Sequence, residues 1–335
     1  MPTLAFFSRL AVPALLLCAA APAQAMDGPL GYDLAGLGGT ELTQGRPAPI
    51  LAAPTAYLQD REIDETILLP TASPEGDDDD RKWARDYISV AGGVITAPSY
   101  NGSDDRVILP GFYVRGRLSG FAFSTRGTNL QVDLIRQKRG QKTDLKFGPI
   151  INLRSDRTGR IKDVQVEALG EKKMAVELGI SAGITHTGIV TSGYDQVGLR
   201  VVGLKDISGK HGSWVVSPTI DYGTPLSKRA FIGVSASMNV YGKGFGRYYF
   251  DVDPLGSAAS GLPVYNRAGD KVTAGKYTIG LAGAYGLSGD LRKGFVLIGG
   301  AQYGRMLGRY ADSPIVADAG SADQWLGGIG LAYQF

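Results

Sequence analysis

Segments that follow residue 86 alternate between apolar positions and small or polar ones. From Val176 to Thr185 every second residue is apolar, and the residues between them are glutamate, glycine, serine or threonine. The segments 277–285 and 295–303 repeat this pattern. Strict alternation over eight to ten residues predicts β-strands with one apolar face and one small or polar face.

These segments are longer than the strands of a typical water-soluble sandwich, which run about 5–6 residues. An apolar outer face and a small, polar inner face, at roughly ten residues per strand, are typical of transmembrane β-barrels. The last segment, 325–335, places Trp325, Ile329, Leu331, Tyr333 and Phe335 on one face, and the chain ends on an aromatic residue. Such an ending resembles the terminal strand by which bacterial outer-membrane proteins are recognised for insertion.

We therefore predict an all-β fold, a transmembrane antiparallel β-barrel of about twelve strands. The predicted strands are 86–97, 106–116, 118–125, 128–136, 144–155, 173–186, 195–206, 212–223, 229–242, 274–286, 292–304 and 323–335. Ten strands is the alternative if the region 118–136 is wrongly divided. With twelve strands, both ends of the chain lie in the periplasm. The long connections 156–172, 243–273 and 305–322 then face outward and the short turns face inward, as in bacterial barrels.

The N-terminal segment 1–25 has the three parts of a secretory signal peptide. Arg9 supplies the positive charge, residues 10–20 are apolar, and Ala23 and Ala25 flank a cleavage site of the small-x-small type. A lipoprotein, processed at Cys18, is the weaker alternative because the preceding Leu17 is large. Cleavage after Ala25 removes the only cysteine, so the mature chain has neither a disulfide nor a cysteine metal ligand.

Residues 26–85 form a separate region of acidic, proline- and glycine-rich sequence. They hold twelve acidic and five basic residues, a net charge of −7, which leaves +9 for residues 86–335. A segment of this composition cannot bury enough apolar surface to order itself, so we predict a disordered arm. Its role is open at this point, and a plug in the barrel is one possibility.

The overall composition excludes two classes of protein. The chain has 48 glycines but no Gly-X-Y period, which excludes collagen. Its formal net charge of +3 is too small to indicate a nucleic-acid partner.

The residues that carry catalytic chemistry elsewhere are scattered in this chain. His186 and His211 fall at opposite ends of the predicted barrel, which argues against a Ser-His-Asp set and against a histidine metal site. Asp251, Asp253 and Asp312 lie on outward loops, where a solvated or arginine-paired role is favoured over a glycosidase pair. The glycine patterns at 242–246 and 327–330 favour a loop turn and strand bending over phosphate binding. We predict no catalytic, cofactor-binding or metal-binding residues and no enzyme activity.

Two basic clusters and a set of aromatic residues complete the candidate features. The first cluster (Arg154, Arg157, Arg160 and Lys162) faces outward, where lipopolysaccharide phosphates and a solvated loop are equally good interpretations. The second cluster (Arg136, Lys138, Arg139 and Lys142) faces the periplasm, where it meets the acidic arm or an acidic partner. Aromatic residues near strand ends predict interfacial girdles: Tyr87, Tyr100, Tyr113, Tyr222, Tyr241, Tyr303 and Trp325.

Several stretches in order resemble the MipA/OmpV family of outer-membrane proteins. They are 90–94 (VAGGV), 97–103 (APSYNGS), 148–150 (GPI), 153–157 (LRSDR), 248–252 (YYFDV), 260–262 (SGL) with Tyr265, 309–316 (RYADSPIV) and 333–335 (YQF). The resemblance covers roughly 86–335 and leaves out residues 26–85. It implies an outer-membrane barrel whose partner is a lytic transglycosylase of the MltA type, and it implies no catalytic residues.

Two functional hypotheses follow. In the first, the protein is a non-enzymatic scaffold or adaptor for periplasmic peptidoglycan-remodelling enzymes, in contact with outer-membrane lipid and lipopolysaccharide. In the second, it is a small-solute channel whose lumen is lined by Glu177, Thr185, Ser235 and Ser237. Single-channel conductance favours the second hypothesis, and recovery of murein enzymes favours the first.

Overall fold

The computed structural model describes residues 86–137, 141–292 and 294–334. The predicted signal peptide, 1–25, and the predicted disordered arm, 26–85, lie outside the described residues.

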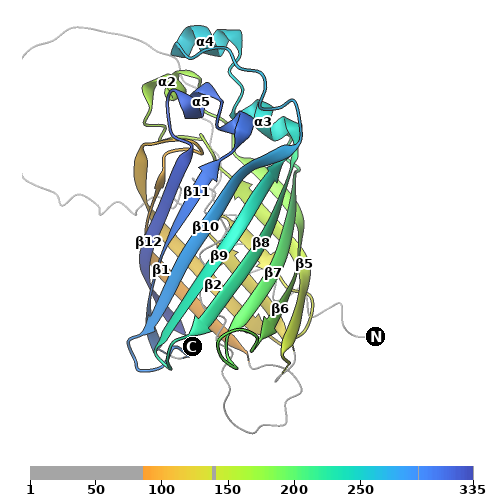
Figure 1. The fold of residues 1–335 in the computed structure, drawn as a ribbon, viewed down its shortest axis with the longest axis vertical. Helices are drawn as coiled ribbons and strands as arrows, with labels where there is room; N and C mark the ends of the chain where they lie inside the picture. The colour runs from red at the N-terminus through yellow and green to blue at the C-terminus, as the bar shows by residue number, and fades with distance from the viewer. Residues whose placement is uncertain (1–85, 138–140, 293, 335) are drawn as a thin grey trace, which may run out of the picture. The chain divides into compact units, whose positions relative to one another are not determined.

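Twelve antiparallel strands form a closed barrel in the described part of the chain (Figure 1). Each strand pairs with its neighbours in the sequence, and β1 pairs with β12 to close the sheet. The strands are β1 (Tyr87–Pro98), β2 (Arg106–Leu118), β3 (Phe121–Arg126), β4 (Asn129–Val132), β5 (Thr143–Arg154), β6 (Ala175–Thr187), β7 (Gln196–Asp206), β8 (Trp214–Pro225), β9 (Ala230–Tyr241), β10 (Thr273–Gly286), β11 (Gly294–Met306) and β12 (Asp323–Gln334). The predicted fold and the number of twelve strands are confirmed, with most boundaries within two residues.

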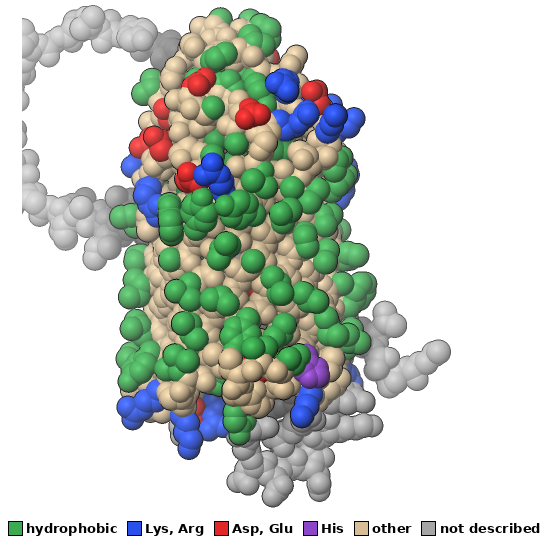
Figure 2. Space-filling model, viewed as in Figure 1, with side chains coloured by type: hydrophobic (Ala, Val, Ile, Leu, Met, Phe, Trp, Pro, Cys, Tyr) green, Lys and Arg blue, Asp and Glu red, His purple; other side chains and the backbone are tan. Residues whose placement is uncertain are grey.

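Alternating side chains point to lipid and to the barrel interior. On β2, Ile108 is 75% exposed and Phe112 is 56% exposed, whereas the neighbouring Val107 and Leu109 are buried. Figure 2 shows the outward apolar side chains across the visible face of the barrel wall, with charged side chains above and below them. This pattern is the one that a lipid-facing barrel requires.

The length of strand β4 is the prediction that the structure corrects most, and β3, predicted over 118–125, is also shorter, with six residues. The alternation predicted a strand over 128–136, but β4 contains four residues. The carboxylate of Asp133 accepts hydrogen bonds from the backbone amides of Ile135, at 3.0 Å, and Phe147, at 3.1 Å. Because this side chain takes up amides that a longer ladder would use, the chain turns after Val132.

Short helices occupy the long connections at one end of the barrel, and the strand pattern did not predict them. They are α2 (Val164–Ala168), α3 (Lys243–Tyr249), α4 (Pro254–Ser260), the 3-10 helix η2 (Gly308–Tyr310) and α5 (Pro314–Ala317). Figure 1 shows them gathered at the end opposite the C-terminus. Since long connections face outward in bacterial barrels, this end is the extracellular one and the end with the C-terminus is periplasmic. None of the helices in the described ranges has the length and apolar character that a bilayer crossing needs.

The close packing of β6 against β7 at Gly179 gives a prediction about the stability of the barrel. A Cβ atom on Gly179 of β6 would lie 1.8 Å from the carbonyl oxygen of Gly203 on β7, whereas a Cβ on Gly203 meets nothing within 4 Å. We expect Gly179→Ala to lower the free energy of unfolding by about 1–3 kcal/mol or to prevent insertion, because a backbone atom must move. Gly203→Ala, the matched control, should leave stability unchanged. Urea unfolding in lipid vesicles measures both, and equal stabilities would contradict the packing seen here.

Candidate functional site

Aromatic side chains close the outer mouth of the barrel. Tyr241, at the outer end of β9, stacks on Phe245 of α3 with ring centroids 4.0 Å apart and planes 10° apart. Phe250 contacts Tyr310 of η2 edge-on at 5.2 Å, and Tyr249 lies 4.9 Å from Phe245. All five rings are at most 1% exposed. The outward loops therefore form a packed hydrophobic core across the mouth, which we call the cap.

A second buried cluster ties the other outward loops into the cap. Tyr100, from the β1–β2 loop, packs with Val166 of α2, Leu262 and Ile315 of α5. Its hydroxyl donates a hydrogen bond to the backbone carbonyl of Ala319 at 2.7 Å. Burial raises the pKa of Tyr100 above its usual range, so the phenol stays protonated.

The placement of Tyr100 and Tyr241 corrects the predicted aromatic girdle, because both belong to the buried cap rather than to the lipid interface. Trp325 does face outward, and its ring lies 5.0 Å from that of Tyr303 on the neighbouring strand. The alternation of apolar and polar residues in the sequence does not distinguish a cap aromatic from a lipid-facing one. Aromatic residues at the outer strand ends occur on both the inner and the outer surface of the barrel.

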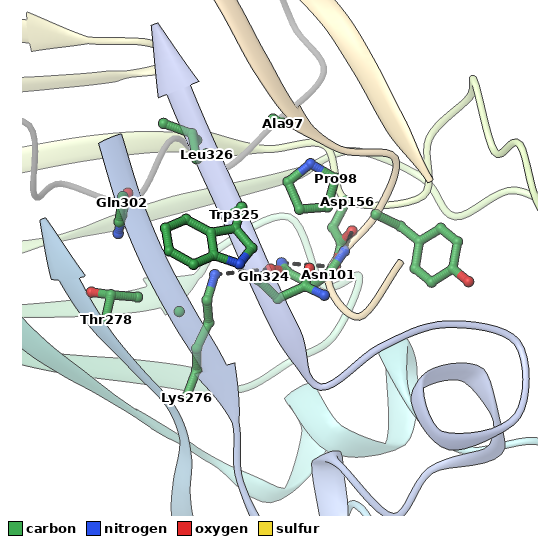
Figure 3. A pocket seen from close by; sticks show the side chains of 12 residues that line it. Ala97, Pro98, Asn101, Asp156, Lys276, Thr278, Gln302, Gln324, Trp325 and Leu326 are labelled. Atoms are coloured by element: carbon green, nitrogen blue, oxygen red, sulfur yellow. Dashed lines mark hydrogen bonds between the residues drawn. The ribbon is translucent and has the colours of Figure 1, made fainter. Parts of the chain in front are cut away.

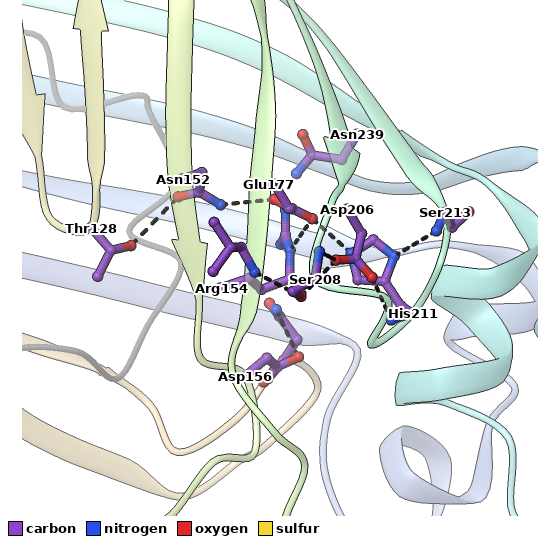
Figure 4. Close-up of polar contacts among 12 residues, drawn as sticks. Thr128, Asn152, Arg154, Asp156, Glu177, Asp206, Ser208, His211, Ser213 and Asn239 are labelled. Carbon is purple, nitrogen blue, oxygen red and sulfur yellow. Dashed lines mark hydrogen bonds and ion pairs between the residues drawn. The ribbon is translucent and has the colours of Figure 1, made fainter. Parts of the chain in front are cut away.

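A buried ion pair lies inside the barrel immediately below the cap (Figure 4). The guanidinium of Arg154 on β5 donates from Nε and Nη2 to the two carboxylate oxygens of Glu177 on β6, at 2.8 and 2.9 Å. Asn152 donates from Nδ2 to the same carboxylate at 2.9 Å. The guanidinium carbon lies 5.1 Å from the ring centroid of Phe245, so the pair also contacts the cap. Such a bidentate geometry fixes both side chains.

His211 joins this ion pair from the β7–β8 loop. Its Nε2 lies 2.9 Å from Glu177 Oε1, and its Nδ1 accepts a hydrogen bond from the backbone amide of Ser213 at 3.2 Å. Nδ1 is therefore the acceptor and Nε2–H the donor in the neutral tautomer. The carboxylate of Asp206 holds the loop by accepting the amides of His211 and Gly212, each at 2.8 Å. These hydrogen bonds anchor the β7–β8 loop. In none of them does the imidazole of His211 contact a side chain that could act as a nucleophile.

The outward basic cluster is corrected in part, because Arg154 and Arg157 are buried rather than presented to solvent or to lipopolysaccharide. Arg157 donates from Nη1 to the backbone carbonyl of Tyr249 at 3.0 Å, which connects the β5–β6 loop to α3. Its backbone is in the left-handed region, with φ of 59°. Burial lowers the pKa of Arg157 below its usual range. Arg160 and Lys162 are exposed, as the sequence predicted.

A small cavity opens beside the cap, between the β1–β2 loop and strands β10 to β12 (Figure 3). Its volume is about 40 Å³, and Asn101, Asp156, Lys276, Gln302 and Gln324 contribute polar groups to its lining. This space suits a few water molecules and is far below the roughly 300 Å³ or more of small-molecule sites.

The periplasmic end contains short turns and the second histidine. His186, near the end of β6, contacts the hydroxyl of Thr143 at 2.7 Å, so the predicted separation of the two histidines is confirmed. In the second basic cluster, the exposed Arg136 lies over the ring of Phe121 at 4.6 Å, and Lys142 is exposed. Lys138 and Arg139 lie outside the described residues.

The three candidate carboxylates on the cap have separate local contacts. Asp251 accepts the backbone amide of Ala268 at 2.9 Å, and burial raises the pKa of its carboxyl. Asp253 accepts the amide of Gly256 at 2.6 Å at the start of α4, and Asp312 is exposed. The described residues hold no group of three or more histidine, cysteine or carboxylate side chains with metal-site geometry. The absence of catalytic, cofactor and metal sites remains a prediction.

The two glycine-rich segments, 242–246 and 327–330, lie in different kinds of structure. Residues 327–330 lie inside β12, as expected, whereas 242–246 begin the helix α3 rather than a simple turn. Asn152 and Asp206 belong to no motif that marks them in the sequence. The strand phase that places Glu177 inside also places both of these residues inside, because Asn152 and Asp206 are its direct cross-strand partners.

The buried ion pair gives the first prediction of this region. Glu177→Gln should lower the free energy of unfolding by about 3–5 kcal/mol, because it leaves the buried Arg154 guanidinium without its counter-charge. Glu167→Gln, on the exposed face of α2, is the matched control. The double variant Arg154→Met with Glu177→Leu should recover most of the loss. Unfolding in lipid vesicles measures all three, and a Glu177→Gln loss no larger than that of the control would refute this account.

The periplasmic β6–β7 turn gives a prediction about pH. Backbone amides, that of Thr191 first and then those of Val190 and Ile189, donate to the carboxylate of Asp195 and lower its pKa to about 2. Because the pKa of Asp195 in the folded protein lies below the usual value of an aspartate, the stabilisation is complete above that usual value. It is lost as the pH falls toward 2.

Amide chemical shifts of residues 189–191, followed by NMR between pH 6 and pH 1, should titrate with a midpoint near the lowered pKa. Asp195→Asn should abolish the transition. A midpoint near the usual value for an aspartate would show that these hydrogen bonds do not persist in solution.

Comparison with known proteins gives a family match and several similar solved structures. The family described as MltA-interacting protein MipA matches residues 90–335. None of the curated proteins searched matches the chain. Among solved structures, an outer-membrane channel from Pseudomonas putida F1 is 14% identical, with a TM-score of 0.36, and the match covers 78% of this chain and 100% of that one. An anion-selective porin from Comamonas acidovorans is 10% identical, with a TM-score of 0.32 and coverages of 75% and 99%. Since the family match extends over most of the sequence and over almost the whole barrel, the chain belongs to the MipA family of outer-membrane β-barrels.

Proposed function

We propose that this barrel is a non-enzymatic adaptor that holds a periplasmic peptidoglycan-remodelling enzyme, of the lytic-transglycosylase type, at the outer membrane. The observation that carries the proposal is the cap, which closes the outer mouth with a buried aromatic core. A barrel closed in this way presents its accessible periplasmic face to partners while its outer face is sealed. The family description, which names an interaction with MltA, supports the same choice.

The periplasmic rim has the charge that such an adaptor needs. Lys228 and Arg229, on the β8–β9 turn, are exposed, and so are Arg136 and Lys142 on the turn before β5. Figure 2 shows lysine and arginine side chains along the lower rim, below the apolar side chains of the barrel wall. Basic residues on short turns favour a partner with an acidic surface, because opposite potentials guide association.

Reversal of charge on the periplasmic rim tests the adaptor function. We expect Lys228→Glu with Arg229→Glu to weaken binding of a purified lytic transglycosylase of the MltA type by about tenfold or more at low salt. The barrel is reconstituted in vesicles with its periplasmic end accessible, and co-sedimentation measures binding. Arg160→Glu with Lys162→Glu, on an exposed outward loop, is the matched control and should bind as the wild type does. Binding that neither pair changes would remove the rim from the proposal, and no binding by the wild type would refute it.

A small-solute channel is the second candidate, and the polar interior favours it. Ser237 contacts Thr278 at 2.6 Å, and Ser217 donates to Asn239 at 2.6 Å, so a band of hydroxyl and amide groups lines the inner wall. If the cap opened, these groups would face water. Conductance in a planar bilayer distinguishes the candidates: we expect a folded but silent barrel, and steady salt-dependent steps would establish the channel instead.

A further inference from the structure

Basic side chains point into the periplasmic half of the barrel. Arg115 and Arg117 on β2 alternate with outward residues such as Phe112, and each is less than 10% exposed. Lys146 on β5 lies between the outward Leu145 and Phe147, and Arg200 on β7 lies between the outward Leu199 and Val201. We call these four residues, Arg115, Arg117, Lys146 and Arg200, the inner cations.

The inner cations occur on one side of the interior and have fewer inward acids near them. Asp144 on β5 and Asp221 on β8 are the inward carboxylates of this half of the barrel, and Asp133 is buried near Asp144. Asp206, the inward acid on β7, lies at the outer end of that strand. Gly183 of β6 pairs with Lys146 on one side and with Arg200 on the other.

The chain enters the barrel beside these cations. Tyr87, the first residue of β1, pairs with Arg117. Its ring centroid lies 5.7 Å from the guanidinium carbon of Arg115 and 5.6 Å from that of Arg117. The carboxylate of Asp86 accepts the backbone amide of Ser119 at 2.8 Å, which fixes the junction at the periplasmic mouth. Whatever precedes residue 86 therefore begins next to two of the four inner cations.

An apolar patch lies on the part of the inner wall formed by β9 to β12 and β1, next to β2, which carries Arg115 and Arg117. Phe231, Leu291 and Val296 belong to a buried cluster near the periplasmic mouth, and Tyr113 of β2 packs against it. A ligand for this interior should therefore have several negative charges and an apolar group a few residues away.

The sequence immediately before the junction has both properties. Asp77, Asp78, Asp79 and Asp80 form an acidic run with Glu75 shortly before it, and Trp83 follows. A chain spans at most about 3.3–3.6 Å per residue, so the seven to ten residues between this run and Tyr87 reach about 25–35 Å. Arg200 lies four residues into β7 from the periplasmic end, about 13 Å along the strand. The run is long enough to reach every inner cation.

We propose that the acidic run 77–80 of this chain binds inside the barrel on the inner cations, with Trp83 against the apolar patch. Opposite charges attract more strongly in the barrel interior than in water, because the local dielectric is lower. A tethered segment also binds at a high effective concentration, since its other end is fixed at Asp86. Bound in this way, the acidic run would occupy the periplasmic half of the lumen.

Cross-linking in the full chain tests this placement. Cys18 is replaced by serine, and Asp79→Cys is combined with Thr219→Cys, an inward residue that pairs with Arg200 and leaves all four cations in place. The matched control combines Asp79→Cys with Val201→Cys, which faces outward on β7. With a short bis-maleimide at low salt, we expect an intramolecular product for the first pair only. Equal yields for the two pairs would overturn the proposal.

Neutralisation of the acidic run tests whether the cross-link depends on an electrostatic contact or only on the proximity of the two cysteines. Conversion of the other three aspartates of the run to asparagine leaves the barrel sequence untouched and should reduce the yield about tenfold. High salt should reduce the wild-type yield in the same direction, because it screens these charges. A yield that neither change affects would refute the electrostatic contact. Absence of the product, together with saturable binding of inorganic phosphate detected by ³¹P NMR, would assign the inner cations to a free anion instead.

Discussion

Closure of the sheet between β1 and β12 is the constraint on which the rest of this protein depends. Eight residue pairs, from Ser89 with Gln334 to Thr96 with Gly327, connect the two ends of the barrel sequence. In lipid an open sheet edge leaves backbone amides and carbonyls without partners, at a cost of several kcal/mol for each group. The pairing between the first and last strands removes both edges together. It also fixes which residues of every other strand face inward.

The inward positions that closure of the sheet defines have to be filled by side chains or hydrated. The outer and periplasmic halves of the barrel interior differ in how this is done. At the outer end, loops that are far apart in the sequence fold into the cap, and the ion pair of Arg154 with Glu177 lies directly below it. A buried ion pair contributes little net stability compared with apolar side chains, but it tolerates only one geometry. This pair therefore fixes how β5, β6 and the loop that carries His211 meet the cap. At the periplasmic end, positive charge and short turns accompany a smaller apolar cluster.

This asymmetry gives the proposed adaptor function a physical basis. A sealed outer mouth leaves the periplasmic end as the accessible face, where Lys228 and Arg229 are exposed. The inner cations add a second basic surface within the same end of the barrel. An acidic segment of the chain would then bind inside the lumen, and an acidic partner protein would bind on the rim.

The sequence by itself determined the barrel, its twelve strands and the side of the sheet on which most residues lie. These features depend on local alternation, and alternation is visible wherever lipid requires an apolar outer face. It also placed His186 and His211 at opposite ends. It overestimated β4, because the capping contacts of Asp133 are not part of a period-two pattern.

Only the tertiary structure decided the state of the outward loops. Arg154, Arg157, Tyr100 and Tyr241 look like surface residues in the sequence, since they stand in polar loops or at strand ends. Each is buried because segments separated by up to about two hundred residues converge on the mouth, as in the hydrogen bond from Tyr100 to Ala319. The alternation within a strand reflects its surroundings because one face of every strand contacts lipid. The surroundings of a loop residue depend on which other loops pack against it, and a local pattern does not contain that information.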